Sequence, residues 1–590
     1  MCALKYNLTA FGSEKKETLY SPDCQIVAYT RQSSREYSSF LGQSVHFAVT
    51  TDSGKHWETL YHNYGKLFAK CDFSEENGIV SKGVHGIMLY RIKDKYIITG
   101  REIRRTNLGT DDFPQQDTGS YVRWTTRDFV TFSDPEICDS RLTETEKSAC
   151  DNKAVVITPG ELDYSEDAVA IGISRATAQK LIENNKTVEF ASVELPQSVI
   201  VSSREELENI KATVRYTDGS VHSKRIRWNL EGIDFTRAGE YSIDGKIAAR
   251  HFPFPVEEHL WGDPVLLYHN KKYYFIATND MNDNKTFEVR EADSPEDIFT
   301  TDARHSILLT ADDGVFTGTF WAPEFHFVGG KLRIFCALSK SGFDPQCHIM
   351  TLRDGGDIMN PDDWSDPVRC VMPDGRYLNI NPLGDGKNGI TLDMTYIEAK
   401  GKSYAVWSSR TWEGTDSGSM LFIAEIDPDE PWKLTSVPQL LTRPRYGWEN
   451  VNGTDNNEGP YAIVTDEKIY LTYSGGSANR DTYVIGLLTA NVGDDLCQVS
   501  NWEKSISPVL ASNFVKGEYG CGHNAFFVDE YGDTYITYHG HDTLESTERI
   551  AGIRRVHFTA DGTPLFDMSN EQDLPENKMN VKIIVSITAP

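Results

Sequence analysis

The chain has 590 residues, enough for about two to four domains, and its 11% aromatic and 25% charged residues are typical of a globular protein with a large core. Its 59 basic and 87 acidic residues give a formal net charge of -28, which argues against nucleic acid or an anionic membrane as a partner. A neutral or weakly charged substrate fits this balance.

Targeting and redox signals are sparse. The beginning, "MCALKYNLTAFGSEKK", shows no basic segment followed by an apolar run, and no stretch approaches the roughly 18 apolar residues of a membrane span. The ten cysteines are scattered without a zinc-type pattern. Free thiols in a reducing compartment are expected, with a disulfide between a few of them as the alternative. The sequence therefore predicts a cytoplasmic protein, or a secreted or periplasmic one if a leader has been removed.

Short strands separated by Gly, Asp, Asn and Pro turns run along the chain and predict an all-β protein. Residues 1–150 are expected to form a separate β domain with blade-like units. Its "TTDSGKHW", from Thr50 to Trp57, matches an Asp-box, a pattern that shapes a hairpin turn. Residues 151–186 are predicted to be a linker with one short helix, at 174–185.

Residues 187–250 change character. Alternating strands, a turn at Asp218-Gly219, the lone Trp228 and the closing "AGEYSIDGKI" suggest an Ig-like β-sandwich. The segment resembles small bacterial Ig-like modules that are appended to polysaccharide-acting enzymes. A spacer or wall is the expected role, with direct sugar binding as the alternative.

A repeat fills residues 255–570 and decides the fold. Five strand-turn-strand units, each followed by a further strand, lie at 263–280, 322–338, 392–409, 458–476 and 523–540. They predict a five-bladed β-propeller, with residues 571–590 left as a C-terminal strand or tail. Because the first strand of every blade lines the axis, residues at the beginnings of these strands should meet in one funnel.

Acidic residues recur at those strand beginnings: Asp263 in "WGDPV", Glu324 in "WAPEF", Asp393 in "TLDMT" and Glu458 in "NNEGPY". One such acid is usually a turn former, but several at the same place of one ring suggest chemistry. Inverting glycoside hydrolysis needs an acid for the leaving oxygen and a base for water. A third carboxylate and partial burial can keep the acid protonated.

Residues 255–565 resemble glycoside hydrolase family 43, the five-bladed propeller enzymes that act on arabinose- and xylose-containing polysaccharides. The resemblance rests on "GDPVLLYHNKKYYFIAT", "FWAPEFHFVGGKLRIF", "LDMTYIEAKGKSYAVW", "EGPYAIVTDEKIYLTYS" and "GCGHNAFFVDEYGDTYITYH", all present in this order. It implies that Asp263 is the general base, Asp393 the orienting and pKa-modulating carboxylate and Glu458 the general acid. Glu324 then has a structural role or supports the groups that touch the substrate.

The resemblance also implies residues around this trio. His523 matches an axial histidine that in some members touches a calcium ion or the substrate; a histidine without metal is the alternative. Arg549 lies where some members place a substrate-binding arginine, with Arg554 as a weaker competitor. Trp261 and Trp321 flank the funnel motifs and are expected to form a sugar-facing wall, or else to pack between blades.

The predicted function is an inverting exo-glycosidase that removes terminal α-L-arabinofuranosyl residues from plant polysaccharides or oligosaccharides. β-D-Xylosidase, endo-arabinanase and β-galactosidase activities are the alternatives within the family, and a non-catalytic glycan-binding propeller is the alternative outside it. No cofactor is required by this chemistry, and a structural calcium ion on the axis is the one metal that the resemblance suggests. The sugar, its linkage and exo or endo action depend on loops that the pattern does not specify.

Overall fold

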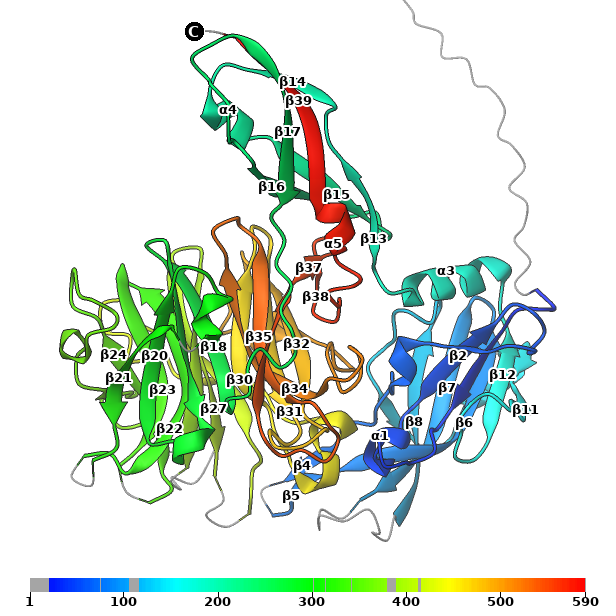
Figure 1. Cartoon of the computed structure of the whole chain (residues 1–590). Coiled ribbons are helices and arrows are strands. Elements are labelled where there is room, and N and C mark those ends of the chain that lie inside the picture. The colour runs from blue at the N-terminus through cyan, green and yellow to red at the C-terminus, as the bar shows by residue number, and fades with distance from the viewer. Residues whose placement is uncertain are drawn as a thin grey trace, which may run out of the picture. The chain divides into compact units, whose positions relative to one another are not determined.

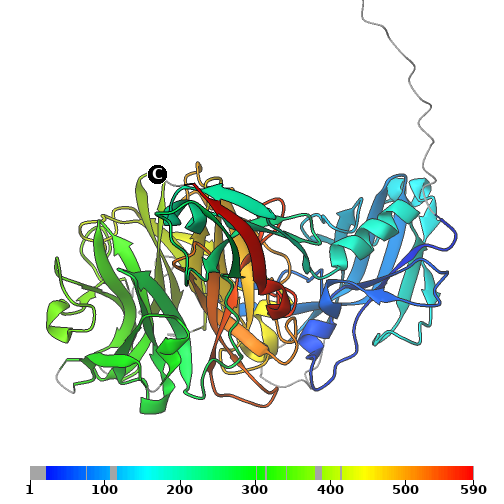
Figure 2. The same ribbon diagram turned by 45° about the horizontal axis from the view of Figure 1, so that its top comes forward.

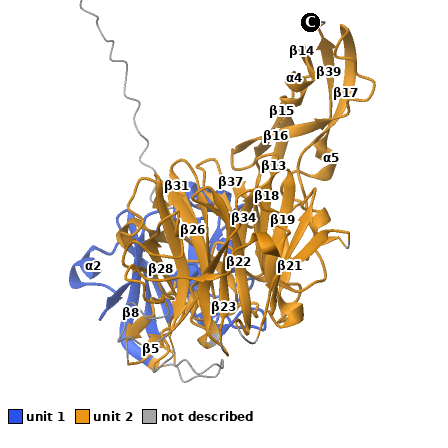
Figure 3. Ribbon diagram, turned by 90° about the vertical axis from the view of Figure 1, so that its left-hand side faces the viewer, with its two compact units in different colours: residues 1–67, 84–103, 117–186 blue, residues 68–83, 104–116, 187–590 orange. Residues whose placement is uncertain are grey.

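A computed structural model describes residues 21–588 except 75, 106–115, 301, 313–314, 341, 379–388 and 412–414. The chain divides into two compact units, one of residues 1–67, 84–103 and 117–186 and the other of residues 68–83, 104–116 and 187–590 (Figure 3). Within the described ranges, cysteines form no disulfide, and no helix there is long and apolar enough to cross a membrane.

The first unit consists mainly of two five-stranded sheets (Figure 1). In sheet order, one has β11 (Val155–Ile157), β12 (Ala168–Gly172), β1 (Gln25–Tyr29), β2 (His46–Thr50) and β3 (Glu58–Thr59). The other has β10 (Asn152–Lys153), β6 (Lys82–Ile92), β7 (Lys95–Arg104), β8 (Gln116–Thr126) and β9 (Glu136–Cys138). The helices are α1 (Ser39–Gly42), α2 (Glu144–Ala149) and α3 (Arg175–Asn185).

The predicted linker at 151–186 is wrong. Its strand β12, "AVAIG", is almost entirely buried and lies between β11 and β1, with Val169 opposite Ala28. An apolar strand of this kind needs partners on both sides, so it belongs to the sheet. The predicted helix is present as α3, and the Ser174 side chain caps its first turn by accepting the N–H of Thr177.

The Asp-box shapes a turn, as predicted. Asp52 Oδ1 accepts the backbone N–H groups of Lys55 and His56, at 3.0 and 3.1 Å. Gly54 adopts a φ of 81°, and a Cβ there would lie 3.4 Å from the ring of Trp57. These contacts hold the hairpin turn closed.

The second unit contains five consecutive antiparallel sheets, which confirm the five-bladed propeller (Figure 1). Blades one and two are β18 (Trp261–His269), β19 (Lys272–Asn279), β20 (Thr286–Ala292), β21 (Arg304–Thr310), then β22 (Gly318–Val328), β23 (Lys331–Ser339), β24 (Pro345–Thr351), β25 (Val368–Arg369). Blades three and four are β26 (Ile390–Ala399), β27 (Lys402–Arg410), β28 (Met420–Glu425), β29 (Gln439–Thr442), then β30 (Glu458–Val464), β31 (Lys468–Gly475), β32 (Val484–Asn491), β33 (Glu503–Lys504). Blade five is β34 (Tyr519–Val528), β35 (Thr534–His541) and β36 (Ile550–Arg555).

The innermost strands close a ring in the order β18, β22, β26, β30, β34 and back to β18. Apolar clusters fill the spaces between blades; Phe335, Trp407 and Phe422, for example, belong to one cluster that joins blades two and three. Because every blade rests on its neighbours, the beginnings of the five inner strands are held around one axis.

A six-stranded sheet occupies the segment that was predicted as an Ig-like sandwich. Its order is β13 (Phe190–Glu194), β15 (Lys211–Tyr216), β16 (Val221–Trp228), β17 (Gly239–Ile247), β39 (Asn580–Ile587) and β14 (Ser198–Val201), with α4 (Arg204–Glu208) and α5 (Glu576–Met579) beside it. The end of the chain is therefore no separate tail: β39 pairs with β17 along its length and with β14 on its other side (Figure 2). The Ig-like assignment stays a prediction.

Two further strand pairs complete the second unit: β37 (His557–Phe558) with β38 (Pro564–Leu565), and β4 (Asp72–Ser74) with β5 (Gly78–Val80). The β4–β5 hairpin lies within residues 68–83, so it belongs to the second unit although it was predicted to be part of the N-terminal domain. The predicted N-terminal domain of residues 1–150 is therefore wrong for residues 68–83, because this stretch contacts the propeller.

Candidate active site

Each inner strand of the propeller carries the same backbone irregularity near its beginning. The pairing register shifts there, and at an equivalent place in each strand a residue adopts a left-handed conformation: Asp263 (φ 54°), Ala322 (43°), Asp393 (53°), Gly459 (54°) and His523 (41°). Strands β22 and β34 each carry a second left-handed residue, Thr319 (51°) and Gly520 (55°). A non-glycine residue in this conformation costs about 1–3 kcal/mol, and such strain clusters at functional sites. These bulges re-aim side chains and bring two carboxyl groups and an imidazole to equivalent places of one ring.

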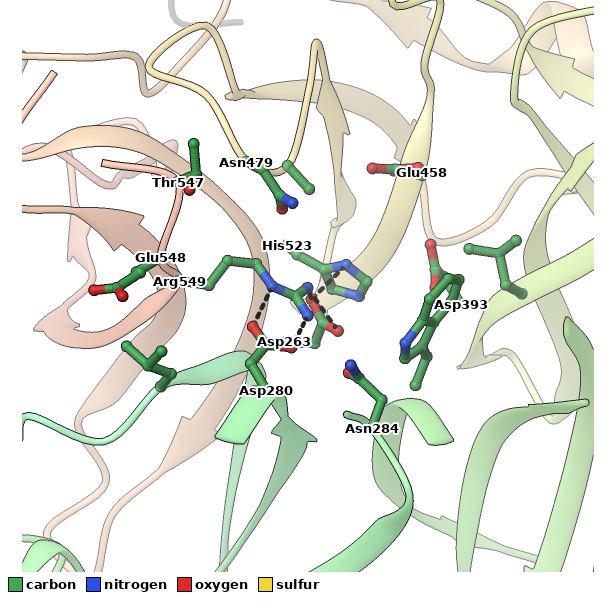
Figure 4. Close-up of a pocket in the computed structure, with 14 residues that line it drawn as sticks. Asp263, Asp280, Asn284, Asp393, Glu458, Asn479, His523, Thr547, Glu548 and Arg549 are labelled. Atoms are coloured by element: carbon green, nitrogen blue, oxygen red, sulfur yellow. Dashed lines mark hydrogen bonds and ion pairs between the residues drawn. The ribbon is translucent and has the colours of Figure 1, made fainter. Parts of the chain in front are cut away.

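A cavity of about 510 Å³ lies at these bulges (Figure 4). It is lined by Leu260, Asp263, Asp280, Asn284, Trp321, Leu392, Asp393, Glu458, Ala478, Asn479, His523, Thr547, Glu548 and Arg549. The structure thus brings together the three predicted catalytic carboxyl groups, His523, Arg549 and Trp321. It leaves Trp261, Glu324 and Arg554 outside the cavity lining.

Asp263 is almost completely buried and is held as a carboxylate. Its oxygens accept the hydroxyl of Thr278 at 2.5 Å and the guanidinium of Arg549 at 3.0 Å, and His523 Nδ1 lies 3.0 Å from Oδ1. Burial acts against its charge, but Arg549 and the imidazoles of His523 and His539 keep the pKa of Asp263 well below its usual range. The group is therefore ionised at neutral pH.

Arg549 joins two acids of the first blade. Besides Asp263, it donates from Nε and Nη2 to the carboxylate of Asp280, at 2.8 and 2.7 Å. Gly262 makes room for it, because a Cβ at that position would lie 2.2 Å from the guanidinium carbon. The glycine before the bulge at Asp263 thus allows Arg549 to approach that carboxylate.

Glu458 has the opposite electrostatic environment. Burial, together with the nearby charge of Asp263, raises the pKa of Glu458 to about 7, against the hydrogen bond from Tyr483, whose hydroxyl lies 3.0 Å from Oε1. The ring of Tyr483 stacks on His539, with centroids 5.3 Å apart, and His539 Nδ1 accepts the backbone N–H of Asp263 at 3.1 Å. The stacked rings of Tyr483 and His539 therefore connect Glu458 with the backbone of Asp263.

Asp393 lies beside Glu458 and shares its tendency to keep a proton. Burial and the charges of Glu458 and Asp263 raise the pKa of Asp393 well above its usual range, while its Oδ2 accepts the backbone N–H of Gly459 at 3.1 Å. Low pKa at Asp263 and high pKa at Glu458 separate a base from an acid within one cavity.

Asn457, the residue before Glu458, is fully buried and bonded on all its polar groups. Its side chain donates to Glu449 at 2.7 Å and accepts from Thr442 and Lys504, both at 3.2 Å. Glu449 is itself fully buried and paired with Lys504 at 2.5 Å. This network fixes the backbone from which Glu458 enters the cavity.

Trp321 and Trp261 lie at different distances, one and two residues, before the left-handed residue at the bulge of their own strand. Trp321 directly precedes the left-handed Ala322, as Glu458 precedes Gly459, and lines the cavity. Trp261 lies two residues before the left-handed Asp263. Because successive side chains of a strand point to opposite faces, the side chain of Trp261 points away from the cavity. It is 0% exposed, belongs to an apolar cluster with Phe275 and donates its indole N–H to Glu257. The predicted substrate contact of Trp261 is therefore wrong.

Glu324 and Arg554 have structural surroundings. Glu324, two residues beyond its bulge, is buried and bonds to His326 at 2.6 Å. Arg554 is buried against Glu518 and Tyr538. The structural role given to Glu324 and the preference for Arg549 over Arg554 both agree with the cavity lining.

His523 shows how far the residues present fit a metal. Its Nδ1 faces Asp263, and its buried Nε2 finds no hydrogen-bond partner among the described residues. Calcium prefers six to eight oxygen ligands, and no group of three or more His, Cys, Asp or Glu that could hold a metal occurs in the described part of the chain. A directly held calcium does not fit this donor set, and the expected ion stays a prediction.

Sequence reasoning missed Asp280, Tyr483, Asn284 and Asn479. Asp280 follows the second strand of its blade, where an acid is an ordinary turn residue, and Tyr483 precedes a third strand, away from the repeated motifs. Only the closed ring brings these positions to the axis, so no local signal identifies them.

The sequence profile described as "Glycosyl hydrolases family 43" matches residues 252–564. An "Extracellular exo-alpha-(1->5)-L-arabinofuranosidase" of Streptomyces avermitilis is 29% identical over 312 residues, 52% of this chain and 61% of that protein. An "Alpha-L-arabinofuranosidase B" of Pyricularia oryzae is 30% identical over 315 residues, 52% of this chain and 60% of that protein. The chain therefore spans about three fifths of these two relatives.

A shorter relative is covered more fully. An "Extracellular exo-alpha-(1->5)-L-arabinofuranosidase" of Streptomyces chartreusis is 31% identical over 310 residues, 52% of this chain and 88% of that protein. The predicted cytoplasmic location is contradicted, because two of the three relatives are named as extracellular enzymes. The match covers the whole five-bladed ring with its three carboxyl groups, and the chain belongs to glycosyl hydrolases family 43.

Proposed function

We propose that this protein is an inverting exo-α-L-arabinofuranosidase that removes terminal arabinofuranosyl residues from plant polysaccharides or oligosaccharides. One observation carries the proposal: a single cavity holds an ionised Asp263 and a Glu458 whose pKa is about 7. Inverting hydrolysis needs this pair of protonation states at the same pH.

In the proposed reaction, the Asp263 carboxylate accepts a proton from a water molecule as that water attacks the anomeric carbon. Glu458 gives its proton to the glycosidic oxygen, which leaves with the remainder of the substrate. The attacking and leaving oxygens lie on opposite faces of the sugar, so the product has the inverted configuration. Inverting enzymes separate their two carboxyl groups by about 6.5–9.5 Å to admit this water.

Asp393 is proposed to orient Glu458 and to disfavour loss of its proton. Its carboxyl group accepts the N–H of Gly459, the residue after Glu458, and each of the two carboxyl groups makes ionisation of the other less favourable. Arg549 is proposed to keep Asp263 charged and to present its remaining N–H groups to sugar hydroxyls.

The cavity supports a small terminal sugar as the ligand. Its volume of about 510 Å³ lies within the roughly 300–1,000 Å³ of small-molecule sites. Trp321 gives an apolar face for the sugar ring, while Asn284 and Asn479 give amide groups for its hydroxyls. Two relatives bear names of exo-acting enzymes, which supports exo action on arabinofuranosides over the xylosidase, endo-arabinanase and galactosidase alternatives.

A non-catalytic glycan-binding propeller is the second candidate. Burial of several carboxyl groups in one cavity is unfavourable unless the cluster has a use, and simple sugar binding does not need two opposite protonation states. No cofactor is required for the proposed reaction. A calcium ion near His523 remains a separate proposal, which a chelator would test by lowering the melting temperature.

The test is hydrolysis of p-nitrophenyl glycosides, arabinan, arabinoxylan and arabinogalactan, with proton NMR of the first product. Release of arabinose with inverted anomeric configuration is expected. Retained configuration would overturn the mechanism, and release of xylose or of long oligosaccharides alone would overturn the proposed specificity. Tight binding of an arabino-oligosaccharide that stays uncleaved would favour the binding module.

A further inference from the structure

A short hairpin from outside the family domain lies against the segments that hold Glu458. Strands β4 and β5 come from residues 68–83, which belong to the second unit although the chain before and after them belongs to the first (Figure 3). The family profile begins at residue 252, so this hairpin is no part of what defines the family.

One side of the hairpin packs on the segment at residues 415–418. The Thr415 hydroxyl donates to the backbone carbonyl of Glu76 at 3.0 Å. Gly78 approaches Asp416 so closely that a Cβ would lie 2.6 Å from its carbonyl oxygen. Ile79 is 4% exposed. The contact is direct and leaves no space for a larger residue at position 78.

The other side reaches the segment at residues 443–446. The N–H of Cys71 donates to the carbonyl of Arg445 at 2.6 Å, and Lys70 bridges to Tyr446. The guanidinium of Arg443 lies 4.1 Å from the ring centroid of Phe73. The hairpin thus bonds to two propeller segments that are separate in sequence.

The segment at residues 415–418 is connected to Glu458 through the side chain of Arg410. Asp416 accepts two bonds from Arg410, at 2.9 and 2.5 Å, and Arg410 donates to Asn456 at 3.4 Å. Burial sets the raised pKa of Glu458, and the positive charge of Arg410 pulls that pKa down. The position of Arg410 therefore affects both the backbone and the charge balance of the acid.

The segment at residues 443–446 is connected to Glu458 through the side chain of Glu449. The backbone N–H of Arg445 donates to Glu449 Oε2 at 2.7 Å. The other oxygen of Glu449 accepts from Asn457, again at 2.7 Å. Both routes thus end at the two residues that directly precede Glu458.

We propose that the β4–β5 hairpin is a positioning element for the general acid: by holding Asp416 and Arg445, it fixes the carboxyl group of Glu458 and the distance of Arg410 from it. The inference rests on the proposed function. It gives a stretch of the N-terminal region a role in the reaction without any contact with substrate.

The main test displaces the hairpin with Gly78→Val, because the added side chain collides with Asp416 and the position has a φ of 65°. On an arabino-oligosaccharide, which needs the acid, kcat/KM is expected to fall about 10- to 100-fold. On a p-nitrophenyl arabinofuranoside, whose leaving group needs little protonation, the fall should be several times smaller. The alkaline limb of the pH profile should move to higher pH as the charge of Arg410 recedes.

A second variant, Asp416→Asn, keeps the hairpin and weakens the Arg410 anchor. It should give the same dependence on leaving group, and the double variant should lose less than the product of the two single effects, since both act on one route. Glu76→Ala is the matched control: its side chain is exposed, and the carbonyl that accepts Thr415 is retained, so its rates should equal those of the wild type.

Equal losses on both substrates with an unmoved alkaline limb would overturn the inference, because they indicate a general structural effect. If Gly78→Val does not fold, as judged by circular dichroism, Asp416→Asn decides by the same criterion. Wild-type protein that hydrolyses neither substrate would overturn the proposed function and this inference with it. An active wild type with equal losses overturns the inference alone.

Discussion

Gly459 donates its backbone N–H to Oδ2 of Asp393 over 3.1 Å, so the residue that follows Glu458 is tied to the carboxyl group of the neighbouring blade. Asn457, on the other side of Glu458, is bonded to Glu449. The proposed proton donor is therefore held at both neighbouring residues. Such a carboxyl group can meet a glycosidic oxygen from one direction, which is what proton donation in the transition state requires.

Replacement of the proposed acid should separate substrates by their leaving groups. Glu458→Gln keeps the size of the side chain and removes the proton donor, so hydrolysis of an arabino-oligosaccharide should fall by about 10²–10⁴-fold. Activity on a dinitrophenyl glycoside should largely survive, because that leaving group departs without a proton. Steady-state kinetics on both substrates provide the measurement, and an equal loss on both would contradict the assignment.

The pH profile should follow the two carboxyl groups. Glu458 must hold its proton, and its pKa is about 7, so kcat/KM should decline above about pH 7. Asp263 must be ionised, and its pKa lies well below 3.8, so the acid limb should appear only below that pH. A profile that rises through pH 7 would contradict both roles.

Tyr483→Phe should move the alkaline limb. The Tyr483 hydroxyl stabilises the charged form of Glu458; without it the pKa of Glu458 rises, and activity should persist to higher pH. The phenylalanine ring keeps the stacking on His539. Tyr470→Phe is the control, since its hydroxyl donates to the carbonyl of Gly562 and does not touch Glu458, and its limb should stay in place.

Gly262→Ala should displace the Arg549 side chain from Asp263. The new Cβ would lie 2.2 Å from the guanidinium carbon, so Arg549 must withdraw from Asp263. The pKa of Asp263 then rises and the acid limb moves to higher pH, with kcat/KM about 100-fold lower. Gly493→Ala, where a Cβ meets nothing within 4 Å, is the control. An acid limb that does not differ between these two variants would show that Arg549 does not govern Asp263.

The two tryptophans should respond in different ways. Trp261 is 0% exposed, so Trp261→Ala should lower the free energy of unfolding by about 3–5 kcal/mol, as thermal or urea unfolding would show. Trp321 is partly exposed in the cavity, so Trp321→Ala should raise KM roughly three- to tenfold with a smaller effect on stability. A larger KM effect at Trp261 would contradict the assignment of the two side chains.

The sequence by itself determined the propeller, and it predicted that Asp263, Asp393 and Glu458 would meet in one cavity. Five repeats of an apolar hairpin can bury their faces only against one another, so the repeat implies a ring. Asp263 and Asp393 stand at the same place in that repeat and Glu458 stands one residue earlier, and a ring brings the beginnings of its inner strands to one axis. The local pattern was enough to predict that these residues lie together, because equivalent positions of the repeat surround one axis in a closed ring.

Only the tertiary structure decided which neighbouring side chains join the trio. Trp261 and Trp321 have similar motifs, but the bulge lies one residue further from Trp261, and a shift of one residue in a strand turns a side chain to the opposite face. Tyr483 and Asp280 reach the site from positions next to outer strands of their blades. The β4–β5 hairpin, from a distant part of the chain, contacts segments that lead to Glu458. Their contacts depend on how the blades close, and no local pattern encodes that closure.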